Sequence, residues 1–217
     1  HRGIVGILNT RLPGGVWLRQ FPWNQFVSVA LNYGHSAPPL HAVVLERFPN
    51  WIELWQRLRQ RGYRRPAWLG FDEPDAADFS QNEAGRHYAS RTVFGAAPLP
   101  SLLLDPDADI AGTKTARSIR QWWQRESPDC LVALNEYVYE IAIRALPRGA
   151  VRGGCCMCLT GALGRWSGFV EDISRAAEVA VDILHSRLRL GRLGESEPPL
   201  LVTVPRRWHE GVTLPDR

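Results

Sequence analysis

Apolar runs alternate with amphipathic stretches along the whole chain. Apolar residues at helical spacing predict helices at 50–63, 82–91, 114–126, 136–145 and 174–191. Short apolar runs bounded by turn residues predict strands at 3–8, 26–34, 41–46, 65–71, 100–105, 129–135, 155–159 and 198–208. Strands that alternate with helices at short intervals imply mainly parallel sheets flanked by helices. The predicted fold class is therefore α/β.

One junction in this pattern is of special interest. In "PDCLVALNEYVYEIAIRAL", residues 128–146, an apolar strand ends at Asn135 and Glu136, and a helical pattern begins at once. Ligands of open α/β sheets bind at the carboxyl ends of strands. Asn is also among the best helix N-cap residues, and a carboxylate in the first turn is favoured by the helix dipole. Capping and ligand binding are compatible, and the sequence leaves both open.

Composition and charge fit a globular protein without a nucleic-acid patch. The 217 residues are 45% hydrophobic and 22% charged, enough for one large domain or two smaller lobes. The formal charge is +4, but the basic residues are arginines scattered near predicted helix ends, with Lys114 as the single lysine. This scatter favours solvated helix faces and salt bridges. No apolar run has the length of a membrane span, and the N-terminus does not resemble a signal peptide. We therefore expect a cytoplasmic protein without a membrane partner.

The four cysteines fit neither a disulfide framework nor a zinc site. Three of them lie in "GGCCMC", which has no two-pair spacing and no histidine nearby. The run is better explained as an extended strand, with Cys156 and Cys158 on one face and Cys155 on the other. Buried thiols in a reducing compartment are the favoured interpretation. No metal and no cofactor are expected.

Catalysis has little support in the sequence. The chain contains no G-x-S-x-G elbow, P-loop, H-E-x-x-H motif or paired cysteine–histidine arrangement. The glycines of "GVWLRQFPW" and "GGCC" do not have the spacing of a phosphate-binding loop. We expect no catalytic residues and no enzyme activity, with an α/β enzyme of unknown type as a minor alternative.

Four segments in the same order and spacing resemble the effector-binding domain of the LacI family of bacterial transcription regulators. They are "LWQRLRQRGYRRPAWLG", "PDCLVALNEYVYEIAIRAL", "SGFVEDISRAAEVAVDILHSRL" and "EPPLLVTVPRRWHEGVTL". The second resembles the family pattern "PDAVxxxNDxxAxGAxxAL", with Asn135-Glu136 in place of Asn-Asp. The helix-turn-helix of the family and the first two strand–helix units of its first lobe have no counterpart here.

The resemblance implies a two-lobed, periplasmic-binding-protein-like fold with three crossovers between lobes. The crossovers would fall near 44–46, 170–173 and 198–202. The first lobe would hold residues 1–44 and 173–199, and the second would hold 45–172 and 200–217. A small effector, a sugar or a related polar metabolite, would bind in the cleft between lobes and control DNA binding through the absent helix-turn-helix. The family's homodimer is also expected, with the helices after Asp172 and around Trp51 and Trp55 as interface candidates.

The family pattern places a set of polar and aromatic residues at the cleft. They are Asn32, Tyr33, Phe79, Asn82, Asn135, Glu136, Thr160 and Glu171. Amides and carboxylates suit sugar hydroxyls, and an aromatic ring such as that of Tyr33 or Trp166 suits the C–H face of a sugar. Asn32 could instead form a turn, and Glu171 could fix the geometry of a crossover.

The chain departs from the family pattern at three of these positions. Asn82 stands where many sugar-binding members have an arginine, and Asn32 and Thr160 stand where they have aspartates. Bidentate arginine binding is lost, so an ordinary hexose is not assured as the effector. A solute-binding protein of a sugar ABC transporter shares the fold and is the alternative function. The N-terminus of the intact gene product would separate the two.

Overall fold

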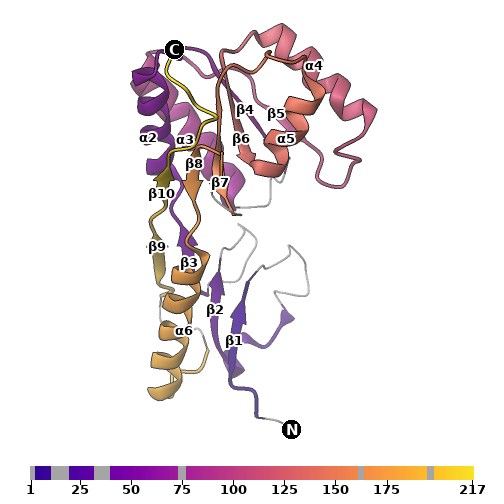
Figure 1. The fold of residues 1–217 in the computed structure, drawn as a ribbon. Coiled ribbons are helices and arrows are strands. Elements are labelled where there is room, and N and C mark those ends of the chain that lie inside the picture. Colours follow the sequence, from indigo (N-terminus) through magenta and orange to yellow (C-terminus); the bar gives the residue numbers. More distant parts are fainter. Residues whose placement is uncertain (1–2, 11–19, 32–39, 73–76, 161–163, 195–197) are drawn as a thin grey trace. The chain divides into compact units, whose positions relative to one another are not determined.

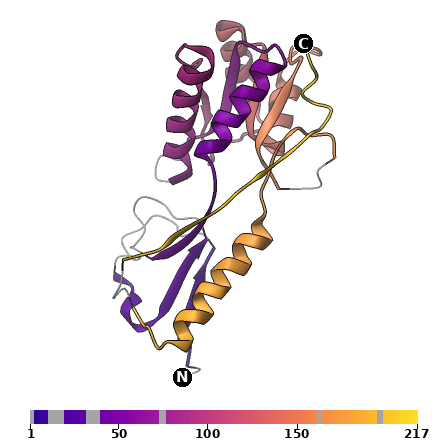
Figure 2. The ribbon, with the colours of Figure 1, turned by 90° about the vertical axis from the view of Figure 1, so that its left-hand side faces the viewer.

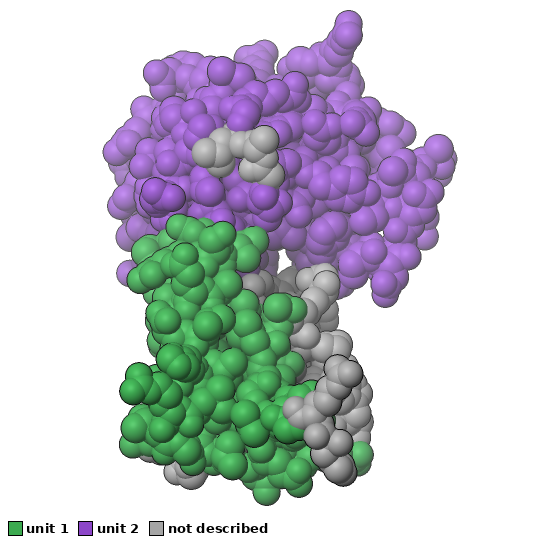
Figure 3. Space-filling view, turned by 60° about the horizontal axis from the view of Figure 1, so that its bottom comes forward, with its two compact units in different colours: residues 1–46, 74–80, 172–205 green, residues 47–73, 81–171, 206–217 purple. Residues whose placement is uncertain are grey.

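The computed structural model describes most of the chain. The described residues are 3–10, 20–31, 40–72, 77–160, 164–194 and 198–217, with the side chains of 77–79 excepted. They form two compact units, which Figure 3 shows in two colours. Unit 1 holds residues 1–46, 74–80 and 172–205, and unit 2 holds residues 47–73, 81–171 and 206–217. Helices flank mainly parallel sheets, so the predicted α/β class is confirmed.

Unit 1 is a parallel sheet with one long helix on its face (Figure 2). Its strands, in spatial order, are β1 (Gly6–Asn9), β2 (Val27–Leu31), β3 (His41–Leu45) and β9 (Leu201–Val204). The short 3-10 helix η1 (Trp23–Gln25) precedes β2. Helix α6 (Ile173–Arg189) packs Ala176 and Ala180 against Val29, Val43 and Val204. Small residues on the helix let its backbone approach the branched side chains of the sheet.

Unit 2 contains a larger sheet covered on both faces (Figure 1). Its strands, in spatial order, are β10 (Arg207–His209), β8 (Gly168–Val170), β7 (Gly154–Leu159), β6 (Cys130–Asn135), β4 (Pro66–Phe71) and β5 (Leu102–Leu104). Its helices are α2 (Phe48–Gln60), α3 (Ala77–Phe94), α4 (Thr113–Glu126) and α5 (Glu136–Ala145). Strand β10 is antiparallel to β8, and the other neighbouring pairs are parallel.

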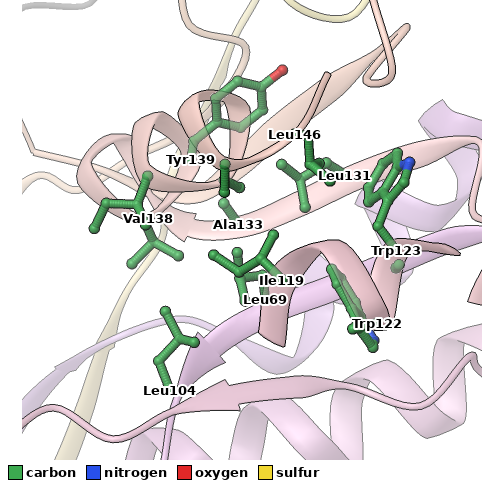
Figure 4. Packing of buried hydrophobic residues seen from close by; sticks show 14 of the residues in the cluster. Leu69, Leu104, Ile119, Trp122, Trp123, Leu131, Ala133, Val138, Tyr139 and Leu146 are labelled. Carbon is green, nitrogen blue, oxygen red and sulfur yellow. The ribbon is translucent and has the colours of Figure 1, made fainter. Parts of the chain in front are cut away.

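Each face of this sheet has its own hydrophobic core. On one face, α4 and α5 pack Ile119, Trp122 and Val138 against Leu69 and Leu131 (Figure 4). The opposite core contains α2 and α3 residues and includes Trp51, Leu54, Trp55, Leu58, Ala89 and Val93. Burial of large apolar side chains on both faces explains why the strands read as continuous apolar runs.

Helix α3 begins at Ala77, earlier than the predicted 82–91. Three of its buried residues are Asn82, Arg86 and Ser90, which recur at a helical spacing of four. Because these polar residues interrupt a buried face that also holds Ala89 and Val93, the helix lacks the continuous apolar stripe on which the prediction depends.

The predicted strand at 198–208 is two strands in two sheets. Strand β9 pairs with β3 in unit 1, and β10 pairs with β8 in unit 2. Pro205 lies between them, and the boundary between the units follows it. The expected lobe division placed residues 200–217 in the second lobe, whereas β9 lies in unit 1. Strand β8, three residues long, was not predicted at all.

Strand β7 is irregular, which corrects the predicted arrangement of its cysteines. Four β7 residues, from Cys156 to Leu159, span the same register as three residues of β8, from Gly168 to Val170, so β7 carries a bulge. Cys156 consequently belongs to the core under α4 and α5, whereas Cys155 and Cys158 belong to the core under α2 and α3. The predicted shared face of Cys156 and Cys158 was therefore wrong. All four cysteines are buried and free, as the sequence indicated.

Arginines occupy the C-terminal ends of the four helices of the larger sheet. Arg64 donates to the carbonyl of Arg59 in α2, and Arg59 donates to that of Val93 in α3. Arg65 donates to the carbonyl of Glu126 in α4, and Arg120 donates to that of Ala145 in α5. The last carbonyls of a helix lack partners within it and carry partial negative charge, so guanidinium groups satisfy them well. These four arginines therefore have a structural role.

Candidate functional site

The carboxyl ends of five parallel strands form one edge of the sheet in unit 2. The residues directly after β4, β5, β6, β7 and β8 are Asp72, Asp105, Glu136, Thr160 and Glu171. Because neighbouring parallel strands end at the same side, these polar groups share one edge with Asn135, the last residue of β6. This edge, which we call the carboxyl edge, is the candidate functional site.

Asn135 caps helix α5, as predicted. Its backbone is extended, and its Oδ1 accepts a hydrogen bond of 3.0 Å from the backbone N–H of Val138. This satisfies one of the N–H groups that a helix start leaves without an intrahelical partner. The structure gives the side-chain NH2 of Asn135 no partner among the described residues, and the residue is partly exposed. One end of the amide is therefore used by the fold, and the other is available as a donor.

Glu136 joins two neighbouring strand ends at the same edge. Its Oε1 accepts a hydrogen bond of 2.9 Å from the backbone N–H of Thr160, directly after β7. The carboxylate also lies in the first turn of α5, where the helix dipole favours negative charge. Thr160 is exposed. Glu136 thus fixes the end of β7 beside Asn135 and leaves the Thr160 hydroxyl at the surface.

Asn82 lies inside unit 2 and not at its surface. The residue is buried, and its Oδ1 accepts a hydrogen bond of 3.1 Å from the indole N–H of Trp51. Trp51 is itself fully buried between α2 and the sheet. The oxygen of Asn82 therefore satisfies a core tryptophan, a partner that the sequence comparison did not indicate.

Glu171 is part of a buried ion cluster. Its Oε1 contacts Nη2 of Arg206 and lies 4.0 Å from Nη2 of Arg47. The Glu171 side chain is 11% exposed, and that of Arg206 is 0% exposed. The contacts involve unit 2 residues only. This arrangement agrees with the alternative role of Glu171, which is to fix the geometry of a crossover.

Four further candidates cannot be placed at the carboxyl edge. Asn32 and Tyr33 lie outside the described residues, as does the side chain of Phe79 in α3. Trp166 belongs to the opposite edge, because it stacks edge-on against Tyr139 at 5.0 Å, and the Tyr139 ring adjoins Gly154, the first residue of β7. Its face also carries the guanidinium of Arg165 at 4.4 Å.

Sequence reasoning did not name Asp72 and Asp105. Both follow strands at the carboxyl edge and are exposed. Asp105 accepts a hydrogen bond from the backbone N–H of Asp107, and the backbone N–H of Asp72 donates to Leu104. Their position directly after, or at the end of, a predicted strand was the signal that could have identified them.

The carboxyl edge therefore offers an amide donor, a hydroxyl and carboxylates within one unit. Such groups can both donate to and accept from a hydroxyl-rich ligand. Within the part of the chain that the structure describes, no group of three or more His, Cys, Asp or Glu side chains could hold a metal ion. Among those same residues, no helix combines the length and apolar character needed to cross a bilayer.

Comparison with solved structures shows which proteins share this fold. A LacI family regulator from Enterococcus faecium with bound ribose superposes with a TM-score of 0.71 at 14% identity, covering 100% of this chain and 81% of that one. A periplasmic binding protein/LacI regulator from Alkaliphilus metalliredigens complexed with D-xylulofuranose gives 0.70 at 11% identity, covering 97% and 77%. A dimeric Lac repressor gives 0.66 at 14% identity, covering 88% and 69%.

The comparisons by sequence found nothing similar. No protein-family model matches the chain, and no curated protein matches it. Identities of 11–14% over most of the chain establish the fold. The chain thus has the fold of LacI-type effector-binding domains, as the sequence resemblance implied.

Proposed function

We propose that this chain is the effector-binding domain of a LacI-type bacterial transcription regulator that senses a sugar or a related polar metabolite. The observation that carries the proposal is Asn135, whose oxygen caps α5 while its NH2 remains available at the carboxyl edge. The fold supports it, since the solved neighbours described above are regulators and two of them hold sugars.

The chemistry of the edge suits recognition without catalysis. The NH2 of Asn135 can donate to a ligand hydroxyl, and the hydroxyl of Thr160 can donate or accept. Glu136 holds the two strand ends together through the Thr160 N–H. No nucleophile hydrogen-bonded to a general base is present among the described residues of this edge, so we propose a sensor and no enzyme. Asn32, Tyr33 and Phe79 remain proposed contacts.

Two of the predicted ligand contacts now have a better-supported structural role. The oxygen of Asn82 is used by Trp51, and the carboxylate of Glu171 is used by Arg206 and Arg47. We therefore rest the proposed binding site on Asn135 and Thr160, with Glu136 as their support.

The regulator is favoured over the transporter alternative because the neighbours are transcription regulators. In the proposed protein, a homodimer presents two DNA-binding helix-turn-helix domains, and effector binding shifts the dimer between two conformations that hold these domains differently. The proposed protein works in the cytoplasm. A helix-turn-helix encoded upstream of His1 would support the regulator, and a signal peptide encoded there would support the transporter.

The proposed dimer cannot use Trp51 and Trp55. Their exposed fractions are 0% and 1%, so their apolar surface is fully used by the core of unit 2. Helix α6 remains a candidate, since Ile173 and Val181 are about half exposed.

Isothermal titration of the purified chain against ribose, D-xylulose, glucose and cellobiose tests the proposal. We expect at least one of these sugars to bind saturably. Sodium chloride and glycerol at equal concentration serve as controls, because a weak unspecific effect would appear with them too. Absence of saturable binding to any sugar of a wider panel, sugar acids and sugar phosphates included, would overturn the proposal.

A further inference from the structure

The ion cluster of Arg47, Glu171 and Arg206 takes no part in the proposed ligand binding. All three side chains are largely buried: the exposed fraction is 5% for Arg47, 11% for Glu171 and 0% for Arg206. Both guanidinium groups approach the same oxygen, Oε1 of Glu171. Charges removed from water interact strongly and are costly to leave unpaired, so this carboxylate holds the two arginines together.

Strand β7 anchors the cluster at three consecutive residues. Nη1 of Arg206 donates to the carbonyl of Met157 at 3.3 Å, and Nη1 of Arg47 lies 3.6 Å from Sγ of Cys158. The backbone N–H of Glu171 donates to the carbonyl of Leu159 at 3.2 Å. Each member of the cluster is thus attached to its own residue at the end of β7.

The cluster lies at the points where the chain enters and leaves unit 2. Arg47 and Arg206 are the first residues of unit 2 after two segments of unit 1, and Glu171 is its last residue before helix α6. Positions 47, 171 and 206 are far apart in sequence. Their convergence on β7 therefore joins three of the chain's passages between the units.

We propose that Glu171 is a positioning residue, which clasps these three connections to β7 and so limits the motion of one unit relative to the other. Effector-driven changes in two-unit proteins depend on a few residues at the connections, which absorb changes in backbone angles. Because the clasp fixes the unit 2 end of each connection, changes in backbone angles are confined to the residues at its unit 1 end. This inference does not rest on the identity, or even the existence, of a sugar effector.

Electron–electron distance measurements on the ligand-free chain test the proposal. Spin labels are attached at Gln121→Cys in α4 of unit 2 and Ser186→Cys in α6 of unit 1, which are both exposed. The four native thiols are buried, so labelling favours the new ones. We expect Glu171→Gln to broaden the distance distribution, because a neutral amide cannot hold two buried guanidinium groups.

Glu83→Gln is the matched control. Glu83 pairs with the buried Arg86 at 2.6 Å, also within unit 2, and among the described residues it contacts none of Arg47, Glu171 and Arg206. It should lower stability without broadening the distribution, which separates clasping from a general loss of an ion pair. Equal distributions for wild type and Glu171→Gln, or equal broadening by Glu83→Gln, would overturn the proposal.

A second variant covers the possibility that Glu171→Gln does not fold. Arg206→Lys keeps the charge, but its single ammonium group cannot reproduce the fork that reaches both Met157 and Glu171. We expect it to fold and to broaden the distribution less than Glu171→Gln. A folded Arg206→Lys protein with the wild-type distribution would contradict the clasp.

Discussion

Asn135 ends strand β6 and begins helix α5, and the two ends of its amide have different partners. The oxygen satisfies the N–H of Val138, and the NH2 lies at the carboxyl edge without a partner among the described residues. A side chain at such a junction can stabilise a helix and contact a ligand at the same time. The structure therefore resolves the choice between cap and contact in favour of a cap that leaves the contact possible.

Replacing Asn135 with alanine tests the cap. We expect Asn135→Ala to lower the free energy of unfolding by about 1 kcal/mol, because the N–H of Val138 loses its acceptor. Urea denaturation measures this change, and Asn135→Ser is the matched control, since serine is an equally good N-cap residue. An alanine variant as stable as the wild type would show that the cap contributes nothing.

Single residues were predictable where the cause is local and unpredictable where it is distant. The cap at Asn135 depends on neighbours within three residues, and the sequence indicated it. The partners of Asn82 and Glu171 are Trp51 and Arg206, which lie 31 and 35 positions away. No spacing rule brings such pairs together, so both residues were predicted as ligand contacts, with a crossover role as the alternative for Glu171.

At the scale of elements, the prediction failed where the usual pattern is absent. Helix α3 buries polar residues, so its start was missed, and the bulge in β7 exchanged the faces of its cysteines. One apolar run was predicted as one strand, although it divides at Pro205 into β9 and β10. Strand β8 was not predicted, and the other helices and strands follow the predicted order, because most of them bury an apolar face of ordinary period.

Close packing of α3 on α2 gives a prediction at Gly85. Alanine is favoured over glycine within a helix by up to about 1 kcal/mol. A Cβ at this position, however, would lie 2.6 Å from Cδ1 of the buried Trp51 ring. We expect the clash to dominate, so Gly85→Ala should lower the free energy of unfolding in urea.

A double-mutant cycle with Trp51→Phe shows whether that clash is the cause. The smaller ring relieves the contact, so Gly85→Ala should cost less in the Trp51→Phe background than in the wild type. An equal cost in both backgrounds, or a more stable Gly85→Ala protein, would contradict the packing that the structure shows.

Strand β7 gives a prediction for alkaline pH. Burial raises the pKa of the Cys155, Cys156 and Cys158 thiols above their ordinary value of 9.0. For Cys158, the nearby Arg206 and Arg47 partly oppose this effect. A raised folded-state pKa means that the unfolded chain releases its protons first as the pH rises. The contribution of these thiols to the free energy of unfolding is therefore fully present below about pH 9 and is lost progressively above it.

Urea denaturation between pH 7.5 and pH 10.5, with a reducing agent present, measures this loss. We expect the free energy of unfolding to fall in the upper part of this range, and the slope to be shallower in Cys156→Ala. Each thiol contributes at most about 1.4 kcal/mol per pH unit. A slope that is unchanged in Cys156→Ala would mean that this thiol ionises equally in both states.

At the scale of the whole molecule, the alternation of strands and helices was sufficient for the fold class. The resemblance of four segments also indicated the architecture of the solved neighbours, although the identities are only 11–14%. The site was less predictable, because it depends on which strand ends become neighbours. Glu136 and Thr160, for example, meet only once β6 and β7 pair.

The arginines lead to a prediction about DNA. Several of them cap helix ends or pair with carboxylates, so they do not form a surface dedicated to phosphates. We expect this chain alone to bind short DNA duplexes weakly and without sequence preference, with an affinity that falls as the salt concentration rises. Gel retardation at two salt concentrations, with unrelated duplexes as controls, measures this. Sequence-specific binding that resists salt would contradict it.

Titration of the wild type and of Asn135→Asp with the same sugar tests the central claim most directly. Aspartate keeps the capping oxygen but removes the NH2 donor at the carboxyl edge. We predict unchanged stability in urea, together with an affinity lowered by about 0.5–1.5 kcal/mol for a lost hydrogen bond. Equal affinity of the two proteins, for a sugar that binds the wild type saturably, would show that Asn135 is only a cap and makes no contact with the effector.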